Sequence, residues 1–181
     1  KAVEAELPDL KLGTAKFIVD QQVDGERVAA SGLDQVAFQV QTNPGTLPGP
    51  LMKVASGGEL SRFLLALKVV LADRGSAPVL IFDEIDTGVG GAVADAIGRR
   101  LKRLSTKVQV LAVTHAPQVA ARADTHLFIE KQAIAEGAFV RTHVRPLAGA
   151  ERNEEIARML AGATITPEAR AAAGKLLSDV A

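Results

Sequence analysis

Two short apolar runs with a helix-like segment between them constrain the fold of this chain more than any other feature. The first run, Val79-Leu80-Ile81-Phe82, leads directly into carboxylates, as expected of a strand buried in a parallel sheet. Residues 108–113 form the second run. Between them, apolar side chains recur at helical spacing, at Val93, Ile97, Leu101 and Leu104. This order predicts an α/β sheet with right-handed crossover connections.

Antiparallel strands are expected on either side of this unit. Residues 15–21 and 33–41 are expected to be strands, and because apolar and polar residues alternate in the second segment, it is expected to bury one face. That face carries Val36, Phe38 and Val40. Residues 125–130 and 139–145 are expected to form a closing hairpin around Glu136-Gly137, with solvent-facing histidines at positions 126 and 143.

Four further helices are expected, and one of them is a short helix after Pro117. Residues 59–71 have apolar side chains at helical spacing, and two helices are expected in the tail. The last helix begins with Thr166 as N-cap and Pro167 at its first position. The helix around residues 93–104 is expected to expose a basic side that carries Arg99, Arg100, Lys102 and Arg103.

Composition narrows the class of protein. Only six of the 181 residues are Phe and none is Trp or Tyr, so aliphatic side chains are expected to build the core. Lys plus Arg and Asp plus Glu both total 21, which excludes a uniformly basic nucleic-acid surface but allows a local patch. The absence of cysteine excludes disulfides and thiolate metal sites. No apolar run reaches the roughly 20 residues of a membrane span.

The first candidate site is Ser56-Gly57-Gly58-Glu59, directly before the helix of residues 59–71. Two glycines allow close approach of a ligand, and a helix start offers unpaired N–H groups with a partial positive charge. The Ser56 hydroxyl adds a donor. The segment therefore predicts a phosphate-sized anion site, and the alternative is a loop in which Ser56 only caps the helix.

The second candidate is Asp83-Glu84-Ile85-Asp86, at the end of the first apolar run. Ligands of open α/β sheets bind beyond the carboxyl ends of the strands. Asp83 there can hold Mg²⁺ through water, and Glu84 can orient or deprotonate an attacking water. The alternatives are a solvated acidic turn, or a phosphoacceptor Asp83 of the receiver-domain kind.

The third candidate is His115, which follows the second apolar run and is expected near the same ligand edge as Asp83. A lone histidine is more often structural, and only its position distinguishes this one. Arg141, His143 and Arg145 alternate on one predicted strand. A solvated face is the favoured interpretation of that alternation, with DNA contact as the alternative.

Together these features resemble the ATP-binding-cassette superfamily. Ser56-Gly57-Gly58-Glu59 resembles its signature motif, and the run from Val79 to Glu84 resembles its Walker B strand. Residues 85–88 are similar to the D-loop and His115 to the switch histidine. Longer strings resemble the RecN family of bacterial DNA repair proteins, which is of the SMC-like type. These strings are LMKVASGGELSR (51–62), FDEIDTGVGG (82–91), THAPQVAA (114–121) and EIARML (155–160).

The phosphate loop of such ATPases, Gly-x-x-x-x-Gly-Lys-Ser/Thr, is absent from the 181 residues. In the RecN family that loop lies near the amino terminus, beyond a long coiled coil. The resemblance therefore implies that residues 1–181 are the carboxy-terminal lobe of an ATPase head. It implies a coiled-coil exit or linker at 1–14, an α/β core at 15–150, and carboxy-terminal helices at 151–181. The isolated lobe is expected to be inactive.

The resemblance also implies a mechanism in which two heads sandwich ATP. Ser56, Gly57, Gly58 and Glu59 belong to the motif that meets the γ-phosphate held by the opposite subunit. Asp83 supports Mg²⁺, Glu84 is the general base, Asp86 crosses the interface, and His115 binds the γ-phosphate in its own head.

The implied partners are the amino-terminal phosphate-loop half, a second copy and DNA, with no membrane, and the implied location is the cytoplasm near the nucleoid. The alternatives are a transporter ATPase subunit and a non-catalytic dimerisation or DNA-docking module.

Overall fold

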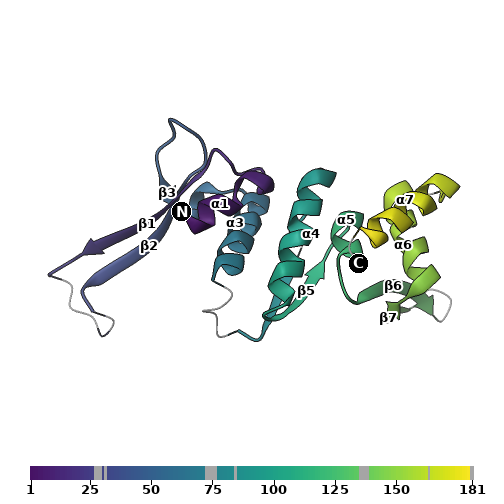
Figure 1. Ribbon diagram of the computed structural model, residues 1–181. Coiled ribbons are helices and arrows are strands. Elements are labelled where there is room, and N and C mark those ends of the chain that lie inside the picture. Colours follow the sequence, from purple (N-terminus) through teal and green to yellow (C-terminus); the bar gives the residue numbers. More distant parts are fainter. Residues whose placement is uncertain are drawn as a thin grey trace. The chain divides into compact units, whose positions relative to one another are not determined.

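The computed structural model describes residues 1–26, 30, 32–71, 77–83, 85–134, 139–162 and 164–179. The chain divides into two compact units, Lys1–Val113 and Thr114–Ala181. Each unit contains strands and helices, which are labelled in Figure 1.

The first unit begins with a helical segment and an antiparallel sheet. Helix α1 (Ala2–Glu6) and the 3-10 turn η1 (Pro8–Leu10) precede strands β1 (Lys16–Val23) and β2 (Asp34–Gln41). These strands pair over their whole lengths, and the short β3 (Gly49–Pro50) pairs with the end of β2. The two strands predicted for this region are therefore confirmed.

The expected buried face of β2 is wrong for most of its length. Val40 is fully buried, whereas Val36 is 62% and Phe38 46% exposed. The two strands extend as a ribbon (Figure 1). The apolar face of these strands is covered at Val40. Along the rest of the ribbon, little in the described part of the chain covers it apart from the contact between the Phe17 and Phe38 rings, whose centroids lie 5.3 Å apart.

Helices α2 (Leu51–Val54) and α3 (Gly57–Val70) follow the sheet. Helix α3 confirms the helix predicted at residues 59–71 and begins two residues earlier. Its side chains Phe63, Leu65, Ala66 and Leu67 are buried, as are Leu7, Leu10 and Leu12 near the amino terminus. The core of the first unit is thus aliphatic with one aromatic ring, as the composition predicted.

The predicted strand–helix–strand crossover is confirmed. Strands β4 (Val79–Asp83) and β5 (Gln109–Val113) pair in parallel, and α4 (Gly91–Ser105) connects them. The expectation that these two strands are buried is wrong, because Ile81 of β4 is 71% exposed and Val113 of β5 is 51% exposed. The reason is that this sheet has only two strands within the described residues, and α4 lies on one side of it.

Arg100 was expected to face solvent, but it is buried. It is 7% exposed, and its Nε donates to Glu6 Oε2 at 2.9 Å. Its Nη2 donates to Asp9 Oδ2 at 3.2 Å and to the main-chain oxygen of Glu6. The amino-terminal segment packs against α4 through these contacts, which a helical periodicity cannot reveal because the partners lie more than 90 residues away.

The second unit confirms the predicted hairpin and tail helices. Helix α5 (Pro117–Ala121) precedes strands β6 (His126–Ile134) and β7 (Phe139–Leu147), which pair antiparallel. The predicted turn at 136–137 lies outside the described residues. Helices α6 (Gly149–Ala161) and α7 (Pro167–Ser178) follow, and Thr166 Oγ1 accepts a hydrogen bond from the Ala169 N–H at 3.2 Å. Ala120, Ala121, Ile156, Ala157 and Ala173 form the core of this unit.

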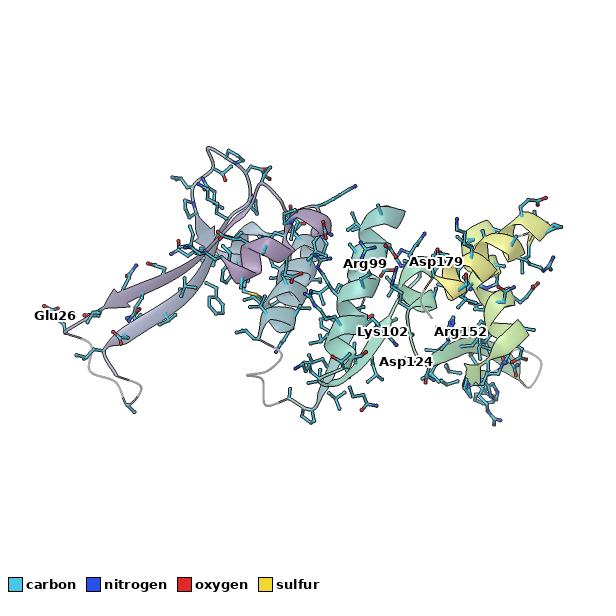
Figure 2. All side chains as sticks on the ribbon, viewed as in Figure 1. Glu26, Arg99, Lys102, Asp124, Arg152 and Asp179 are labelled. Carbon is cyan, nitrogen blue, oxygen red and sulfur yellow. The ribbon has the colours of Figure 1, made fainter. Side chains whose placement is uncertain are left out.

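Arg152 joins α6 to the end of α5. Its Nη2 donates to the main-chain oxygens of Ala120, Ala121 and Ala123 (Figure 2). His126, expected to face solvent, is half-buried beside it. Burial and the charge of Arg152 lower the pKa of His126. Across the part of the chain that the structure describes, no helix has the length and apolar character to span a membrane.

Candidate functional site

The signature turn, residues 56–59, forms the start of helix α3. Ser56 is the N-cap, and its Oγ accepts a hydrogen bond from the Glu59 N–H at 3.4 Å. Glu59 Oε2 in return accepts from the Ser56 N–H at 2.9 Å and from the Ser56 hydroxyl at 2.8 Å. This is a capping box, and its hydrogen bonds hold the pKa of the Glu59 carboxyl below its ordinary value. Ser56 therefore caps the helix, and its hydroxyl proton is donated to Glu59.

The two glycines of the signature turn differ in their surroundings. Neither Gly57 nor Gly58 has a positive φ, so the backbone itself does not demand glycine at either position. A Cβ at position 58 would lie 3.3 Å from Nη1 of Arg62 and 3.3 Å from the carbonyl oxygen of Thr87. A Cβ at position 57 would meet no atom of the described residues within 4 Å. Packing inside the first unit therefore explains Gly58, whereas the space beside Gly57 is open.

The second candidate segment continues from the end of β4. Asp83 is exposed at the carboxyl end of this strand, in register with Val113 of β5. Glu84 lies outside the described residues. Ile85 and Asp86 are fully buried in the first unit, and Gly88 turns the chain with a φ of +72°. Residues 85–88, the D-loop turn, thus enter the core before Gly88 turns the chain.

The signature turn and the D-loop turn come together although some thirty residues separate them. The carbonyl oxygen of Thr87 lies 3.3 Å from the point that a Cβ of residue 58 would occupy, and both residues belong to the first unit. His115, the third candidate, is an exposed residue of the second unit, two residues beyond the end of β5. Its expected approach to Asp83 therefore stays a prediction.

The arrangement suits an anion and a hydrated magnesium ion. The start of a fourteen-residue helix supplies N–H groups and a partial positive charge at the signature turn. A single exposed carboxylate such as Asp83 suits Mg²⁺, which keeps several waters and binds substrate phosphates. Among the described residues no group of three or more His, Asp or Glu side chains gathers as a metal site. An ion shared with a nucleotide fits this carboxylate better than a protein-enclosed ion.

One residue near the signature turn was missed at the level of sequence. Arg62 is 9% exposed, and its Nη1 lies beside Gly58. Burial lowers the pKa of Arg62, and the neighbouring Glu59 opposes this effect. The available signal was the spacing of four residues between Gly58 and Arg62, which places them on one face of a helix.

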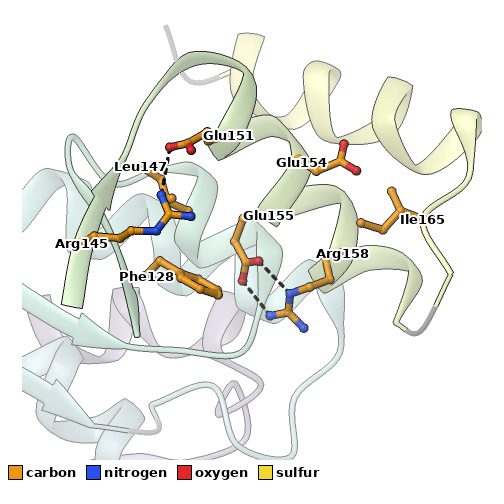
Figure 3. A pocket seen from close by; sticks show the side chains of 8 residues that line it. All are labelled: Phe128, Arg145, Leu147, Glu151, Glu154, Glu155, Arg158 and Ile165. Carbon is orange, nitrogen blue, oxygen red and sulfur yellow. Dashed lines mark hydrogen bonds and ion pairs between the residues drawn. The ribbon is translucent and has the colours of Figure 1, made fainter. Parts of the chain in front are cut away.

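A pocket in the second unit lies between the hairpin and helix α6 (Figure 3). Its charged side chains are already paired, and the partner of Glu154 is Arg170 outside the lining. Arg145 pairs with Glu151 at 3.0 Å and stacks over the Phe128 ring, while Arg158 and Glu155 share two hydrogen bonds of 2.7 Å. We therefore do not assign a ligand to this pocket, and Arg145 is occupied by contacts within the unit.

Comparison with curated proteins identifies close relatives, although no protein-family model matches the chain. It is 47% identical over 177 residues to the DNA repair protein RecN of Rickettsia conorii, covering 98% of this chain and 32% of that protein. RecN of Xylella fastidiosa strain 9a5c is 44% identical over 173 residues, which are 95% of the chain and 31% of the relative. RecN of Halalkalibacterium halodurans is 49% identical over 147 residues, with 81% and 26% covered. The chain spans about a third of the length of these relatives.

Solved structures with a similar fold are SMC heads. The Smc head with coiled coil and joint from Pyrococcus yayanosii has a TM-score of 0.62 at 16% identity, covering 86% of this chain and 28% of that chain. The Smc head from Pyrococcus furiosus bound to the C-terminal domain of ScpA has a TM-score of 0.55 at 19% identity, covering 88% and 37%. A structure described in terms of ATP-driven dimerization and DNA-stimulated activation of SMC ATPases has a TM-score of 0.54 at 15% identity, covering 90% and 91%.

These likenesses agree with the fold expected from the sequence, the carboxy-terminal lobe of an SMC-type ATPase head with mixed α/β structure. The identities to RecN are far higher and extend over nearly the whole chain. By sequence, this chain matches the carboxy-terminal part of the bacterial DNA repair protein RecN, and its fold is similar to that of SMC heads.

Proposed function

We propose that this chain supplies the signature, Walker B, D-loop and switch-histidine segments of an ATPase head that dimerises around ATP in DNA double-strand-break repair. The observation that carries the proposal is the geometry at the start of α3. The signature turn contacts the D-loop turn at Thr87, and the space beside Gly57 is open to a ligand from outside the chain. The name of the curated relatives and the ATP-driven dimerization described for one SMC structure support this function.

Each candidate residue has a role in this proposal. The Ser56 hydroxyl and the N–H groups of Gly57 and Gly58 receive the γ-phosphate held by the facing subunit, within the motif that Glu59 closes. Asp86 is fully buried, so it acts at this interface by holding the D-loop turn next to Thr87 and not by reaching the facing subunit itself.

The remaining candidate residues have roles in hydrolysis. Asp83 holds Mg²⁺ through water, and the ion neutralises charge on the phosphates. Glu84 accepts the proton of the attacking water, and His115 contacts the γ-phosphate within its own head.

Phosphate docking requires a change in the capping box. The single proton of the Ser56 hydroxyl is donated to Glu59 in this chain, so it must turn towards the phosphate when the heads meet. The helix remains capped during this change, because the Ser56 oxygen still accepts from the Glu59 N–H. Ser56 therefore exchanges one acceptor for another without loss of the helix start.

The proposal includes a second part of the same protein. The sheets of the first unit leave apolar side chains such as Ile81, Phe38 and Val36 in solvent, which is unfavourable unless another segment covers them. An amino-terminal half that carries the phosphate loop is the covering segment we infer. Residues 1–14 are the coiled-coil exit or linker and contribute Leu7, Leu10 and Leu12 to the core of the first unit. Residues 15–150 are the rest of the core, and residues 151–181 are the final helices. DNA is the macromolecular partner, in the cytoplasm near the nucleoid.

A mixing experiment tests the shared site. In the whole protein, Ser56→Arg places a bulky cation where the facing γ-phosphate docks, so ATP-dependent dimerisation and hydrolysis should fail while each head still binds ATP. Ser178→Arg adds the same charge at an exposed position of α7 and should have no effect. Mixed with a phosphate-loop variant, Ser56→Arg should form hybrids with one intact site and regain activity. Without rescue at any mixing ratio, the cross-subunit role of Ser56 is wrong.

A further inference from the structure

Arg62 lies where the signature turn meets the D-loop turn. It follows Gly58 by one helical turn, and helical side chains lean towards the amino-terminal end of their helix. Its guanidinium therefore points back along α3, and Nη1 lies 3.3 Å from where a Cβ of residue 58 would be. The carbonyl oxygen of Thr87 is equally close to that point. The cation thus stands behind the N–H groups of the signature turn and next to the D-loop turn.

This cation is buried without a carboxylate partner in the described part of the chain. Arg62 is 9% exposed, and its Nε has no hydrogen-bond partner. Glu59 is the nearby anion, but its carboxylate accepts from Ser56. Arg100 provides the contrast, because it is equally buried but bound to the carboxylates of Glu6 and Asp9. Burial of an unpaired charge is unfavourable, so the stability of this chain does not explain an arginine at position 62.

We propose that Arg62 is a positioning residue for the terminal phosphoryl group of a nucleoside triphosphate that docks on the signature turn. Its positive charge adds to that of the helix start, and its place beside Thr87 keeps the D-loop turn in register with the signature turn. The charge is uncompensated until the anionic phosphoryl group arrives from the facing subunit. This inference rests on the proposed function and adds a residue to the site.

The test compares three variants of the whole protein. Arg62→Met removes the charge and keeps the length of the side chain, whereas Arg62→Lys keeps a charge. Lys68→Met is the matched control, because it removes an exposed charge from the same helix. The measurements are the binding of a fluorescent ATP analogue to single heads, ATP-driven dimerisation by sedimentation at several salt concentrations, and the melting temperature without nucleotide.

Arg62→Met should raise the Kd of ATP-driven dimerisation by about tenfold or more, as expected for loss of an interaction with a charged group. It should also reduce the salt dependence of dimerisation, because one charge no longer takes part. ATP binding to single heads should not change, and the melting temperature without nucleotide should stay the same or rise. Arg62→Lys should restore most of the dimerisation, and Lys68→Met should behave like the parent protein.

The opposite pattern would overturn the proposal. If Arg62→Met dimerises as tightly as the parent protein, the charge has no role at the phosphoryl group. If Arg62→Met lowers the melting temperature, the Arg62→Lys variant distinguishes a role in dimerisation from a structural role. Failure of Arg62→Lys to restore dimerisation would show that Arg62 is a structural residue of its own head. The shared-site function is judged separately by rescue of Ser56→Arg, so rescue together with normal dimerisation of Arg62→Met refutes only the inference about Arg62.

Discussion

The open space beside Gly57 leads to a prediction in which stability and function change in opposite directions. Gly57 is the first residue of helix α3, without a positive φ, and a Cβ there would meet no atom within 4 Å. Replacement of a helical glycine by alanine generally stabilises by about 0.5–1 kcal/mol, because the unfolded chain loses conformational freedom. We therefore expect Gly57→Ala to raise the free energy of unfolding of the 181-residue chain by up to about this amount.

Gly58→Ala is the matched comparison one residue along. The same conformational gain applies, but the new methyl group would lie 3.3 Å from the Thr87 carbonyl oxygen and from Nη1 of Arg62. The end of the arginine side chain can move, whereas the carbonyl belongs to the backbone of the D-loop turn. The gain should be cancelled or reversed, so Gly58→Ala should be less stable than Gly57→Ala by about 1 kcal/mol.

Urea unfolding of the two variants measures this difference, and ATP-driven dimerisation of the whole protein measures the functional effect. Gly57→Ala should dimerise poorly although it is the more stable variant, because its methyl group occupies the space where the facing phosphate docks. Normal dimerisation of Gly57→Ala would refute the assignment of a ligand to this space. Destabilisation by Gly57→Ala would show that atoms of the chain itself fill it.

The remaining predictions concern four other features. Glu84→Gln in the whole protein should keep ATP binding and lower turnover by roughly 10²–10⁴-fold, since the amide cannot accept a proton; normal turnover would remove Glu84 from the mechanism. The isolated chain should show no multiple turnover of ATP, and any turnover free of contaminating ATPase would contradict this. The folded-state pKa of Glu59 is lowered from 4.5, so the capping box stabilises the folded chain above pH 4.5, and this stabilisation is lost as the pH falls through the lower folded-state pKa. In Glu59→Gln, the free energy of unfolding should therefore depend less on pH in this range, as acid unfolding would show. Arg100→Met should lower the free energy of unfolding by about 1.5–3 kcal/mol, because the hydrogen bonds to Glu6 and Asp9 are lost while Arg103 still pairs with Glu6, and chemical denaturation would measure it.

The sequence alone determined the elements whose signals are local. The crossover from β4 through α4 to β5 was predictable because apolar periodicity distinguishes a helix from its flanking strands. The cap at Ser56 followed from a serine three residues before a glutamate at a helix start, and Thr166 with Pro167 marked the last helix in the same way. The family resemblance also depended on contiguous strings, so it needed no coordinates.

Only the tertiary structure decided features that depend on distant segments. Helical spacing places Arg100 on the same face of α4 as Ile97 and Leu104, but only the structure showed its carboxylate partners Glu6 and Asp9, more than 90 residues away. The contact of Gly58 with Thr87 likewise required the D-loop turn to fold against α3. Phe38 and Ile81 were predicted to be buried but are exposed. Alternation and apolar runs indicate which face of a strand is apolar, and they do not indicate whether another segment of the chain packs against that face. Local chemistry therefore named the groups of the signature turn, and long-range packing decided which of its two glycines faces the chain and which faces open space.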